Sequence, residues 1–272
     1  MTKKIDNKLI SGAFFDLDKT IIAKSSMLAF SKTFRKNGLL SRRALVQAAY
    51  AQVVFQLVGA NENKMERLRG IALELTKGWN HDHVKDLVNE TIHDVVVPII
   101  YEDAIELIDK HKSEGHLVFI VSSAPIEVVE PIAFHLGVTD FIATTARLDE
   151  NGNYSGELDF YSYGSYKPQA VLRLAKEYDL DLEHSFAYSD SITDVPLLEC
   201  VGNPIAVNPD KELYRVAKER GWEIKYFSRT VSLWDRLPVR FFQNGWVRII
   251  SGTIFTLGIS VLLMPKSIIK KK

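Results

Sequence analysis

The sequence contains almost no cysteine and no excess charge of either sign, and each absence excludes a class of protein. Cys200 is the only cysteine among 272 residues, so the chain can form neither an internal disulfide nor a zinc site of several thiolates. Lys plus Arg and Asp plus Glu both number 34, which gives a formal net charge of zero. A nucleic-acid-binding domain usually carries a basic field. We therefore expect no nucleic-acid partner.

The first residues also lack a targeting signal. Residues 1–9 carry three lysines, and the apolar run that follows already contains Asp16, which is not the pattern of a signal peptide. We therefore expect this end of the chain in the cytoplasm. Hydrophobic residues make up 46% and charged residues 25% of the sequence, close to the averages for globular proteins. The length is sufficient for one α/β domain with an accessory domain.

Short apolar runs that end in polar residues recur along the chain. They cover residues 13–17, 116–121, 185–188 and 204–207. Between them lie helical patterns at residues 102–114, 125–136 and 167–178. This alternation predicts an α/β fold with a doubly wound parallel sheet. In such sheets ligands bind beyond the carboxyl ends of the strands, where the polar residues of these runs stand.

Two segments interrupt the alternation. Residues 24–98 are mainly helix-forming and amphipathic, most clearly at 44–58 and 64–76, and predict a helical cap over the site. Residues 154–166, rich in Tyr, Gly and Ser, predict a hairpin or flap. The expected organisation is a catalytic core of residues 1–23 and 99–230, a helical cap of residues 24–98, and a C-terminal tail of residues 231–272.

Two carboxylates stand two residues apart at the end of the first apolar run. An extended backbone points alternate side chains the same way, so Asp16 and Asp18 can face one ligand. An isolated pair of this kind is equally well a solvated turn. Further polar residues follow at later strand ends or helix starts: Ser122, Lys167, and Asp190 with Asp194.

In this order these residues resemble the four motifs of the haloacid dehalogenase superfamily of hydrolases, and most closely its phosphoserine-phosphatase-like branch, subfamily IB. The first motif, D-x-D-x-T, runs from Asp16 to Thr20. The resemblance spans residues 13–210 and identifies the helical insert with the type-one cap of the family. One departure is Ser189, which stands where a glycine commonly precedes the aspartate of the fourth motif.

The resemblance implies an Mg²⁺-dependent phosphatase that acts through an aspartyl-phosphate intermediate. Asp16 is then the nucleophile. The Mg²⁺ ligands implied are the side chains of Asp16 and Asp190 and the main-chain carbonyl of Asp18. Asp18 also protonates the leaving alcohol and later deprotonates the attacking water.

The remaining motif residues have supporting roles in the resemblance, and each also has an ordinary structural interpretation. Ser122 and Lys167 bind the phosphate, Asp194 orients Lys167 or a metal-bound water, and Thr20 supports the first motif. Alone, Ser122 suits a helix N-cap, Lys167 a surface lysine, and Asp194 the first turn of a helix.

The sequence does not identify the substrate. Phosphoserine phosphatases place a glutamate nine residues after the nucleophile to bind the substrate ammonium, whereas this chain has Ser25 there. Five cap arginines are candidates to bind a substrate carboxylate: Arg35, Arg42, Arg43, Arg67 and Arg69. The substrate that we expect is thus defined only as a small-molecule or lipid-linked phosphate.

The C-terminal segment predicts attachment to a membrane. Residues 249–264 carry no charge, and a span needs about 20 apolar residues. Trp246 and Arg248 precede the run, and lysines follow it. On this interpretation the enzyme is tethered to the inner face of the cell membrane; a buried or self-packing helix is the alternative.

Two other functions fit the same motifs. A phosphotransferase or mutase uses the same intermediate with an alcohol acceptor in place of water. A catalytically silent, membrane-tethered binding protein is disfavoured, because every expected catalytic side chain is present.

Overall fold

The computed structural model describes residues 10–41, 62–164 and 166–231. The chain divides into two units, residues 1–231 and 232–272, and everything described belongs to the first. The helix expected at residues 44–58 and the C-terminal tail lie outside the described residues. Among the described helices, none has the length and apolarity that a membrane crossing requires.

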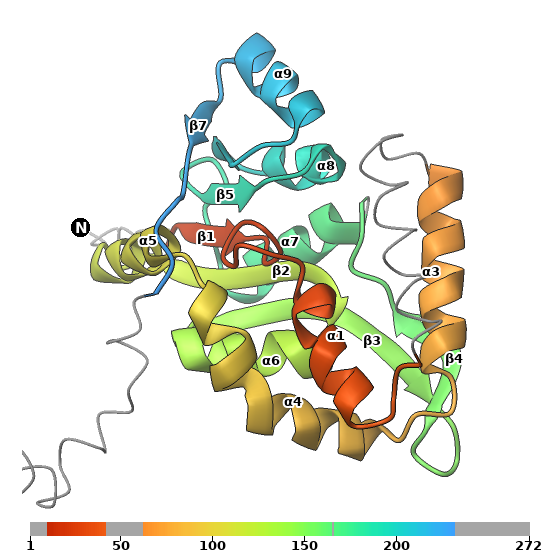
Figure 1. Ribbon diagram of the computed structural model, residues 1–272. Helices are drawn as coiled ribbons and strands as arrows, with labels where there is room; N and C mark the ends of the chain where they lie inside the picture. Colours follow the sequence, from red (N-terminus) through yellow and green to blue (C-terminus); the bar gives the residue numbers. More distant parts are fainter. Residues whose placement is uncertain (1–9, 42–61, 165, 232–272) are drawn as a thin grey trace, which may run out of the picture. The chain divides into compact units, whose positions relative to one another are not determined.

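The core of the molecule is a seven-stranded sheet in the order β4-β3-β2-β1-β5-β6-β7 (Figure 1). The strands are β1 (Gly12–Phe15), β2 (Leu117–Pro125), β3 (Asp140–Leu148), β4 (Tyr154–Phe160), β5 (Phe186–Ser189), β6 (Asn203–Val207) and β7 (Glu223–Lys225). Neighbouring strands are parallel except for the edge pair β3–β4. The predicted α/β, doubly wound fold is confirmed, with one antiparallel edge strand.

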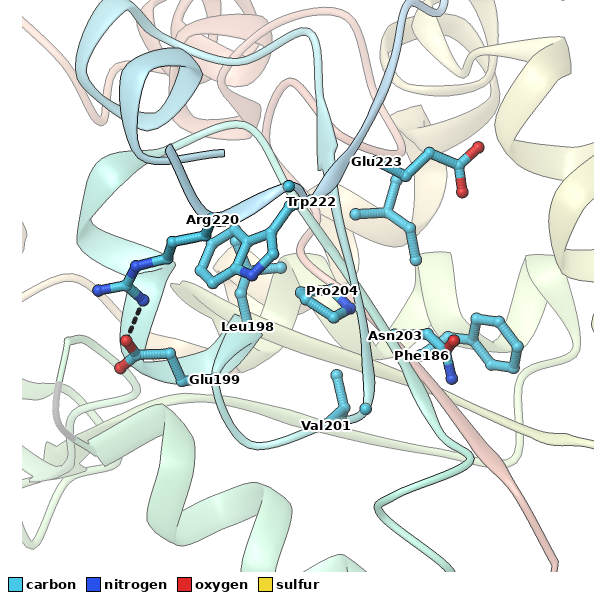
Figure 2. A pocket seen from close by; sticks show the side chains of 12 residues that line it. Phe186, Leu198, Glu199, Val201, Asn203, Pro204, Arg220, Trp222 and Glu223 are labelled. Atoms are coloured by element: carbon cyan, nitrogen blue, oxygen red, sulfur yellow. Dashed lines mark hydrogen bonds and ion pairs between the residues drawn. The ribbon is translucent and has the colours of Figure 1, made fainter. Parts of the chain in front are cut away.

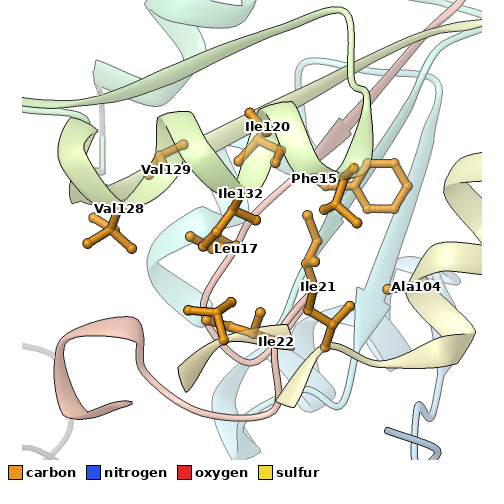
Figure 3. Packing of buried hydrophobic residues seen from close by; sticks show 14 of the residues in the cluster. Phe15, Leu17, Ile21, Ile22, Ala104, Ile120, Val128, Val129 and Ile132 are labelled. Atoms are coloured by element: carbon orange, nitrogen blue, oxygen red, sulfur yellow. The ribbon is translucent and has the colours of Figure 1, made fainter. Parts of the chain in front are cut away.

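The central strand β1 is apolar because both of its faces are covered. Phe14 stacks on Phe119 with ring centroids 5.1 Å apart, and on the other face Phe15 stacks on Tyr188 at 4.4 Å. Adjacent strand residues point to opposite faces, so these two residues belong to separate hydrophobic clusters. Figure 3 shows the cluster that contains Phe15. A strand buried on both sides leaves only its ends for polar chemistry.

Helices cover both faces of the sheet. They are α5 (Glu102–Ser113) and α6 (Ile126–Leu136) on the face of Phe15, and α7 (Tyr166–Glu177), α8 (Val195–Leu198) and α9 (Lys211–Arg220) on the face of Phe14. The single-turn helices η1 (Val97–Ile99) and η2 (Ile192–Asp194) complete the connections. The three helices expected from the sequence at 102–114, 125–136 and 167–178 are present, with ends that differ by one residue.

The described residues between β1 and α5 form the helices α1 (Ser26–Lys36), α3 (Glu62–Thr76) and α4 (His81–Val95), followed by η1. α1 buries Phe30 and Phe34. The side chain of Asn80 accepts a hydrogen bond from the His83 N–H at the start of α4, and α4 packs against α6. The segment that the sequence assigned to a helical cap therefore consists of helices and short connections wherever it is described.

The sequence did not indicate strands β3 and β7. β3 holds two threonines and an arginine in a half-exposed run, and β7 is only three residues long, so neither forms a dense apolar pattern. Residues 154–166, where a hairpin or flap is expected, hold only one strand, β4, which forms a hairpin with the preceding strand β3. Gly152 makes the turn between them with a positive φ of 75°, a conformation that glycine adopts without strain.

Gly202 is required by a close approach of two backbone segments. A Cβ at this position would overlap the carbonyl oxygen of Glu183, and a backbone atom cannot move aside as a side chain can. We expect Gly202→Ala to lower the free energy of unfolding by about 1–3 kcal/mol. Gly70→Ala is the matched control, because Gly70 lies in α3 with open space around it, and it should raise stability by about 0.5–1 kcal/mol. Urea unfolding would measure both; equal effects would contradict this role.

Candidate active site

The predicted site residues gather at the carboxyl ends of the central strands. Asp16 directly follows β1 and Asp190 directly follows β5, and these two strands are neighbours in the sheet. The chain runs outward from β1 to β2 and β3, then returns to the other side of β1 with β5, so this is the point where the strand order reverses. The Asp16 N–H donates to the Tyr188 carbonyl at 2.9 Å, which extends the pairing to the carboxylate itself.

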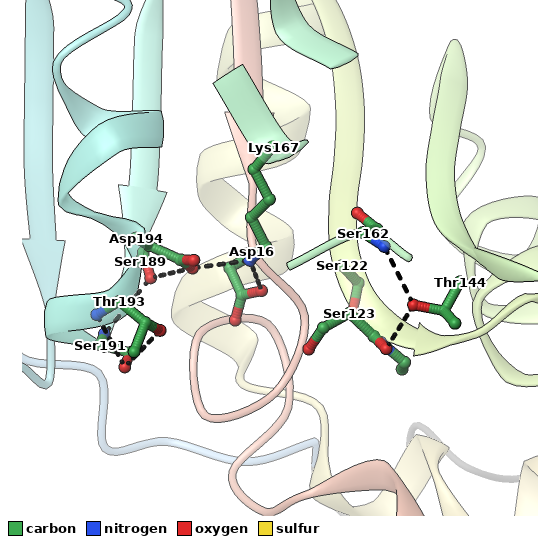
Figure 4. Close-up of polar contacts among 11 residues, drawn as sticks. Asp16, Ser122, Ser123, Thr144, Ser162, Lys167, Ser189, Ser191, Thr193 and Asp194 are labelled. Carbon is green, nitrogen blue, oxygen red and sulfur yellow. Dashed lines mark hydrogen bonds and ion pairs between the residues drawn. The ribbon is translucent and has the colours of Figure 1, made fainter. Parts of the chain in front are cut away.

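Lys167 lies buried between two aspartates (Figure 4). Its Nζ is 2.7 Å from Asp16 Oδ1 and 2.7 Å from Asp194 Oδ2, and only 2% of the residue is exposed. The surface-lysine interpretation is therefore wrong. The Ser189 hydroxyl donates to the same Asp194 oxygen at 2.7 Å. Ser189, which departs from the motif of the family, thus helps to hold the carboxylate that orients Lys167.

Burial and charge act in opposite directions on this cluster. Burial raises the pKa of Asp16, while the neighbouring Lys167 opposes the rise. For Lys167, burial disfavours the ammonium, but attraction to Asp16 and Asp194 outweighs burial and raises its pKa. Lys167 therefore stays protonated and supplies the positive charge that two buried carboxylates require.

Asp18 has its carboxylate turned toward the first cap helix. Its Oδ1 accepts a hydrogen bond of 2.9 Å from the Ser26 N–H at the start of α1. Burial raises the pKa of Asp18, and the hydrogen bonds from Ser26 and Ser25 oppose that rise. A carboxyl group with a raised pKa suits proton transfer near neutral pH.

Asp190 is held through its backbone and carries a strongly perturbed carboxyl group. Its carbonyl accepts from the Asp210 N–H at 2.8 Å, and the Asp210 side chain accepts from Ile192 N at 2.9 Å. Burial, followed by repulsion from Asp16, raises the pKa of Asp190 to about 8. Lys19 Nζ lies 3.9 Å from Asp190 Oδ2, and this ion pair only partly opposes the rise in pKa. Asp210 was not identified from the sequence as a support of Asp190.

Two further motif residues, Ser122 and Thr20, are also buried. Ser122 is 1% exposed, and its Oγ accepts from the Ala124 N–H at 3.1 Å. Helix α6 begins at Ile126 with Pro125 as its N-cap, so Ser122 is not the helix N-cap. Thr20 is fully buried, and its hydroxyl has no hydrogen-bond partner among the described residues.

The donor set at the strand ends fits Mg²⁺. Asp16, Asp190 and Asp194 are buried and Asp18 is half-buried, whereas Lys167 is the only buried cation in contact with them among the described residues. Oxygen ligands with excess negative charge are what Mg²⁺ prefers. The carboxylates of Asp16, Asp18 and Asp190 do not all lie within 4.8 Å of one another, as a three-carboxylate site would need. That separation is compatible with a ligand set in which Asp18 offers its main-chain carbonyl.

His111 of α5 contacts both His116 and Tyr188, which belongs to β5. The spacing of the two histidines in the sequence did not predict this contact. His111 Nδ1 lies 2.8 Å from His116 Nδ1, and His111 Nε2 lies 2.7 Å from the Tyr188 hydroxyl. With Glu114 the two histidines form a group of three possible metal ligands. In the described part of the chain, no other group of three or more His, Cys, Asp or Glu residues has ligand atoms that all lie within 4.8 Å of one another. Burial lowers the pKa of His111 to about 4, so His111 is neutral and serves as a core hydrogen-bonding residue.

Two of the cavities lined by the described residues differ in their relation to the aspartates. A cavity of about 290 Å³ lies between the cap helices and the carboxyl end of β2, and Asp18 and Ser123 are part of its lining. A larger cavity of about 610 Å³, with Trp222 and the Glu199–Arg220 ion pair in its wall (Figure 2), lies where β5 and β6 begin. Strands β5 and β6 run parallel, so the second cavity is at the opposite edge from Asp190.

Comparison with known proteins identifies the family. The family model of haloacid dehalogenase-like hydrolases matches residues 13–199. The inhibition of morphological differentiation protein of Streptomyces azureus is 48% identical over 240 residues, which are 88% of this chain and 87% of that protein. A probable phosphatase of Mycobacterium tuberculosis is 50% identical over 228 residues, 84% of this chain and 79% of that one. A phosphoserine phosphatase of the same organism is 34% identical and covers 80% of this chain and 71% of its own.

Solved structures show the same fold. A Bordetella pertussis protein of unknown function has a TM-score of 0.68 and 27% identity, over 79% of this chain and 98% of its own. A phosphoserine phosphatase solved as an analogue of its phospho-aspartyl intermediate has a TM-score of 0.59 at 18% identity, over 82% of this chain and 96% of that one. The chain therefore belongs to the haloacid dehalogenase-like hydrolases, and it is a phosphatase of that family.

The perturbed carboxyl group of Asp190 generates a prediction about stability and pH. Its pKa is about 8 in the fold, against an ordinary value of 3.8, so the metal-free folded protein holds a proton that the unfolded chain has lost. Stability should therefore fall as the pH rises from about 4 through about 8. Asp190→Asn should remove a few kcal/mol of that change.

Urea unfolding in a chelator at pH 5 and pH 8 would measure this difference. Asp159→Asn is the control, because Asp159 pairs with Arg147 on the surface. At pH 8, Mg²⁺ should stabilise the wild type and the control by binding the folded state, and stabilise Asp190→Asn much less. Parallel pH profiles for all three proteins would contradict the prediction.

Proposed function

We propose that this chain is an Mg²⁺-dependent phosphomonoester hydrolase that acts through an aspartyl-phosphate on Asp16. The main support is the contact of Asp16 with Lys167 at 2.7 Å. Asp190 stands at the end of the neighbouring strand, and Lys19 at 3.9 Å is the cation nearest to its carboxylate among the described residues. Transfer of a phosphoryl group needs an aligned nucleophile and positive charge around the phosphate oxygens. This cluster supplies both where the strand order reverses.

In the first half of the reaction, Asp16 Oδ2 attacks the phosphorus while Lys167 holds the other oxygen of the carboxylate. The new O–P bond forms as the ester P–O bond breaks, and Asp18 donates its proton to the departing alkoxide. The raised pKa of Asp18 keeps that proton available. The products of this half are a free alcohol and phosphorylated Asp16.

In the second half, water attacks the same phosphorus and Asp18 takes its proton. The P–O bond to Asp16 breaks, inorganic phosphate leaves, and both aspartates return to their starting states. Lys167 offsets the charge on the phosphoenzyme, and Ser122 and its neighbouring backbone N–H groups bind phosphate oxygens. Mg²⁺, when bound by Asp16, Asp190 and the Asp18 carbonyl, supplies further positive charge to the phosphate.

A phosphotransferase is the second candidate, because an alcohol can replace water in the second half. Release of inorganic phosphate without an added acceptor favours the hydrolase. A silent binding protein would retain the fold and the metal site without turnover. The complete set of Asp16, Asp18 and Lys167 supports an active enzyme.

The nucleophile and the proton donor should respond differently to substitution. Asp16→Asn should abolish turnover, because the amide is nearly isosteric but a far poorer nucleophile. Asp18→Asn should lower the turnover of alkyl phosphates about 10²–10⁴-fold and slow p-nitrophenyl phosphate less, because that leaving group needs little protonation. Steady-state phosphate release with Mg²⁺ would measure both variants. Covalent phosphate on Asp16, found by mass spectrometry of the quenched wild type, is the direct readout; retained turnover in Asp16→Asn would exclude the mechanism.

The C-terminal tail extends the proposal to localisation. Residues 249–264 carry no charge and lie outside the described residues, so attachment to the inner face of the cell membrane rests on sequence alone. The full chain should sediment with membranes, and a chain that ends at residue 240 should stay in the supernatant with its phosphatase activity intact. Fractionation followed by phosphate-release assays would measure both. Membrane association of the shortened chain would remove the basis for the tether.

A further inference from the structure

The cavity between the cap helices and the sheet is predominantly apolar although it adjoins a site for a dianionic group. It holds about 290 Å³ and is lined by side chains of α1, α3 and α4 on one side and of β2, β3, β4 and α6 on the other. Its apolar lining includes Phe34, Leu73, Trp79, Val128, Tyr154 and Leu158. An apolar lining of this kind favours an apolar ligand group.

The polar side chains of the lining are largely occupied by protein partners. Glu127 is 5% exposed; it receives the hydrogen bond of the Tyr154 hydroxyl and lies 3.4 Å from His81 Nε2. The Thr144 hydroxyl donates to the Ser123 carbonyl. Because Glu127 is engaged on both sides, it is a poor receptor for a substrate ammonium group.

Thr76 and Arg69 also have partners on the protein. The Thr76 hydroxyl donates to the Ala72 carbonyl at 3.1 Å, inside its own helix. The Arg69 guanidinium lies 5.2 Å from the centre of the Tyr161 ring, a cation–π contact. Both side chains therefore have partners within the protein.

Asp18 links this cavity to the reacting bond. It belongs to the lining, and in the proposed mechanism it gives its proton to the ester oxygen of the leaving alcohol. The first carbon of the alcohol, which is bonded to that oxygen, must then lie close to the Asp18 carboxyl group. Because Asp18 lines this cavity, the body of the alcohol extends into it.

From this geometry we propose that the substrate is a phosphate monoester of a small apolar alcohol, aliphatic or aromatic, whose body occupies the cavity. The inference rests on the proposed chemistry at Asp16 and Asp18. A volume of about 290 Å³ accommodates about ten groups the size of a water molecule. Ser25, which replaces the ammonium-binding glutamate of phosphoserine phosphatases, is not part of this lining.

A series of straight-chain alkyl phosphates tests the proposal. These esters share nearly the same leaving-group basicity, so differences in kcat/KM report binding of the chain and not intrinsic reactivity. From methyl to hexyl phosphate, kcat/KM should rise about two- to fourfold per methylene, because each buried methylene adds hydrophobic transfer energy. It should level off by decyl phosphate, when the cavity is full. O-phosphoserine should be a poorer substrate than butyl phosphate.

Two substitutions in α3 form a matched pair. Ala72 is part of the lining, whereas Ile71 is exposed on the same helix and is not. Ala72→Trp should fill the cavity and lower the hexyl-to-methyl ratio of kcat/KM at least tenfold, while Ile71→Trp should keep the wild-type ratio. Leu73→Ala, which removes part of the lining, should lower the ratio about threefold or more and serves if the tryptophan variant does not fold.

The possible outcomes separate this inference from the proposed function. A flat alkyl series with Asp16-dependent turnover would overturn the apolar assignment and leave the phosphatase chemistry intact. A preference for O-phosphoserine, or a rise that continues beyond decyl phosphate, would overturn it as well. If no phosphate monoester were turned over in the presence of Mg²⁺, the proposed function itself would fail.

Discussion

The site depends on one buried contact, in which a single ammonium group lies between two carboxylates. Lys167 reaches Asp16 and Asp194 at 2.7 Å each, and all three residues are at most 6% exposed. Loss of one partner from a buried ion cluster leaves a charge without compensation, at a cost of about 3–5 kcal/mol. The contact therefore joins the end of β1 to α7 and η2, and it also orients Asp16, the proposed nucleophile. Stability and the proposed chemistry rely on the same atoms.

The two hydrophobic clusters on the faces of the sheet fix the position of β1, and with it the position of that contact. Phe14 and Phe15 pack on opposite faces of β1. The strand is therefore fixed from both sides immediately before Asp16. The backbone hydrogen bond from Asp16 to Tyr188 then ties the proposed nucleophile to β5, the strand that Asp190 follows. Polar residues concentrate at one edge because the rest of these strands is enclosed.

Local sequence patterns predicted the parts of the molecule that local interactions determine. The apolar runs of β1 and β2 and the periodic pattern of α5 need no knowledge of distant residues, and the motif residues follow such runs directly. The hydrogen bond from Ser189 to Asp194 and the pairing of His111 with His116 depend on side-chain placement that spacing does not reveal. The cavity beside Asp18 could not be predicted from the sequence either, because residues as distant in the chain as Phe34 and Leu158 form its wall. β7 was missed because three residues are too few for a periodic signal.

The hydrogen bond from Ser26 to Asp18 has a consequence for how the two layers work together. It joins the proton-donating carboxyl group to the first turn of α1, and that helix also supplies Phe34 to the cavity wall. A movement of α1 would therefore either break this bond or carry the carboxyl group with it. The cavity wall and the proposed proton donor thus depend on the placement of one helix.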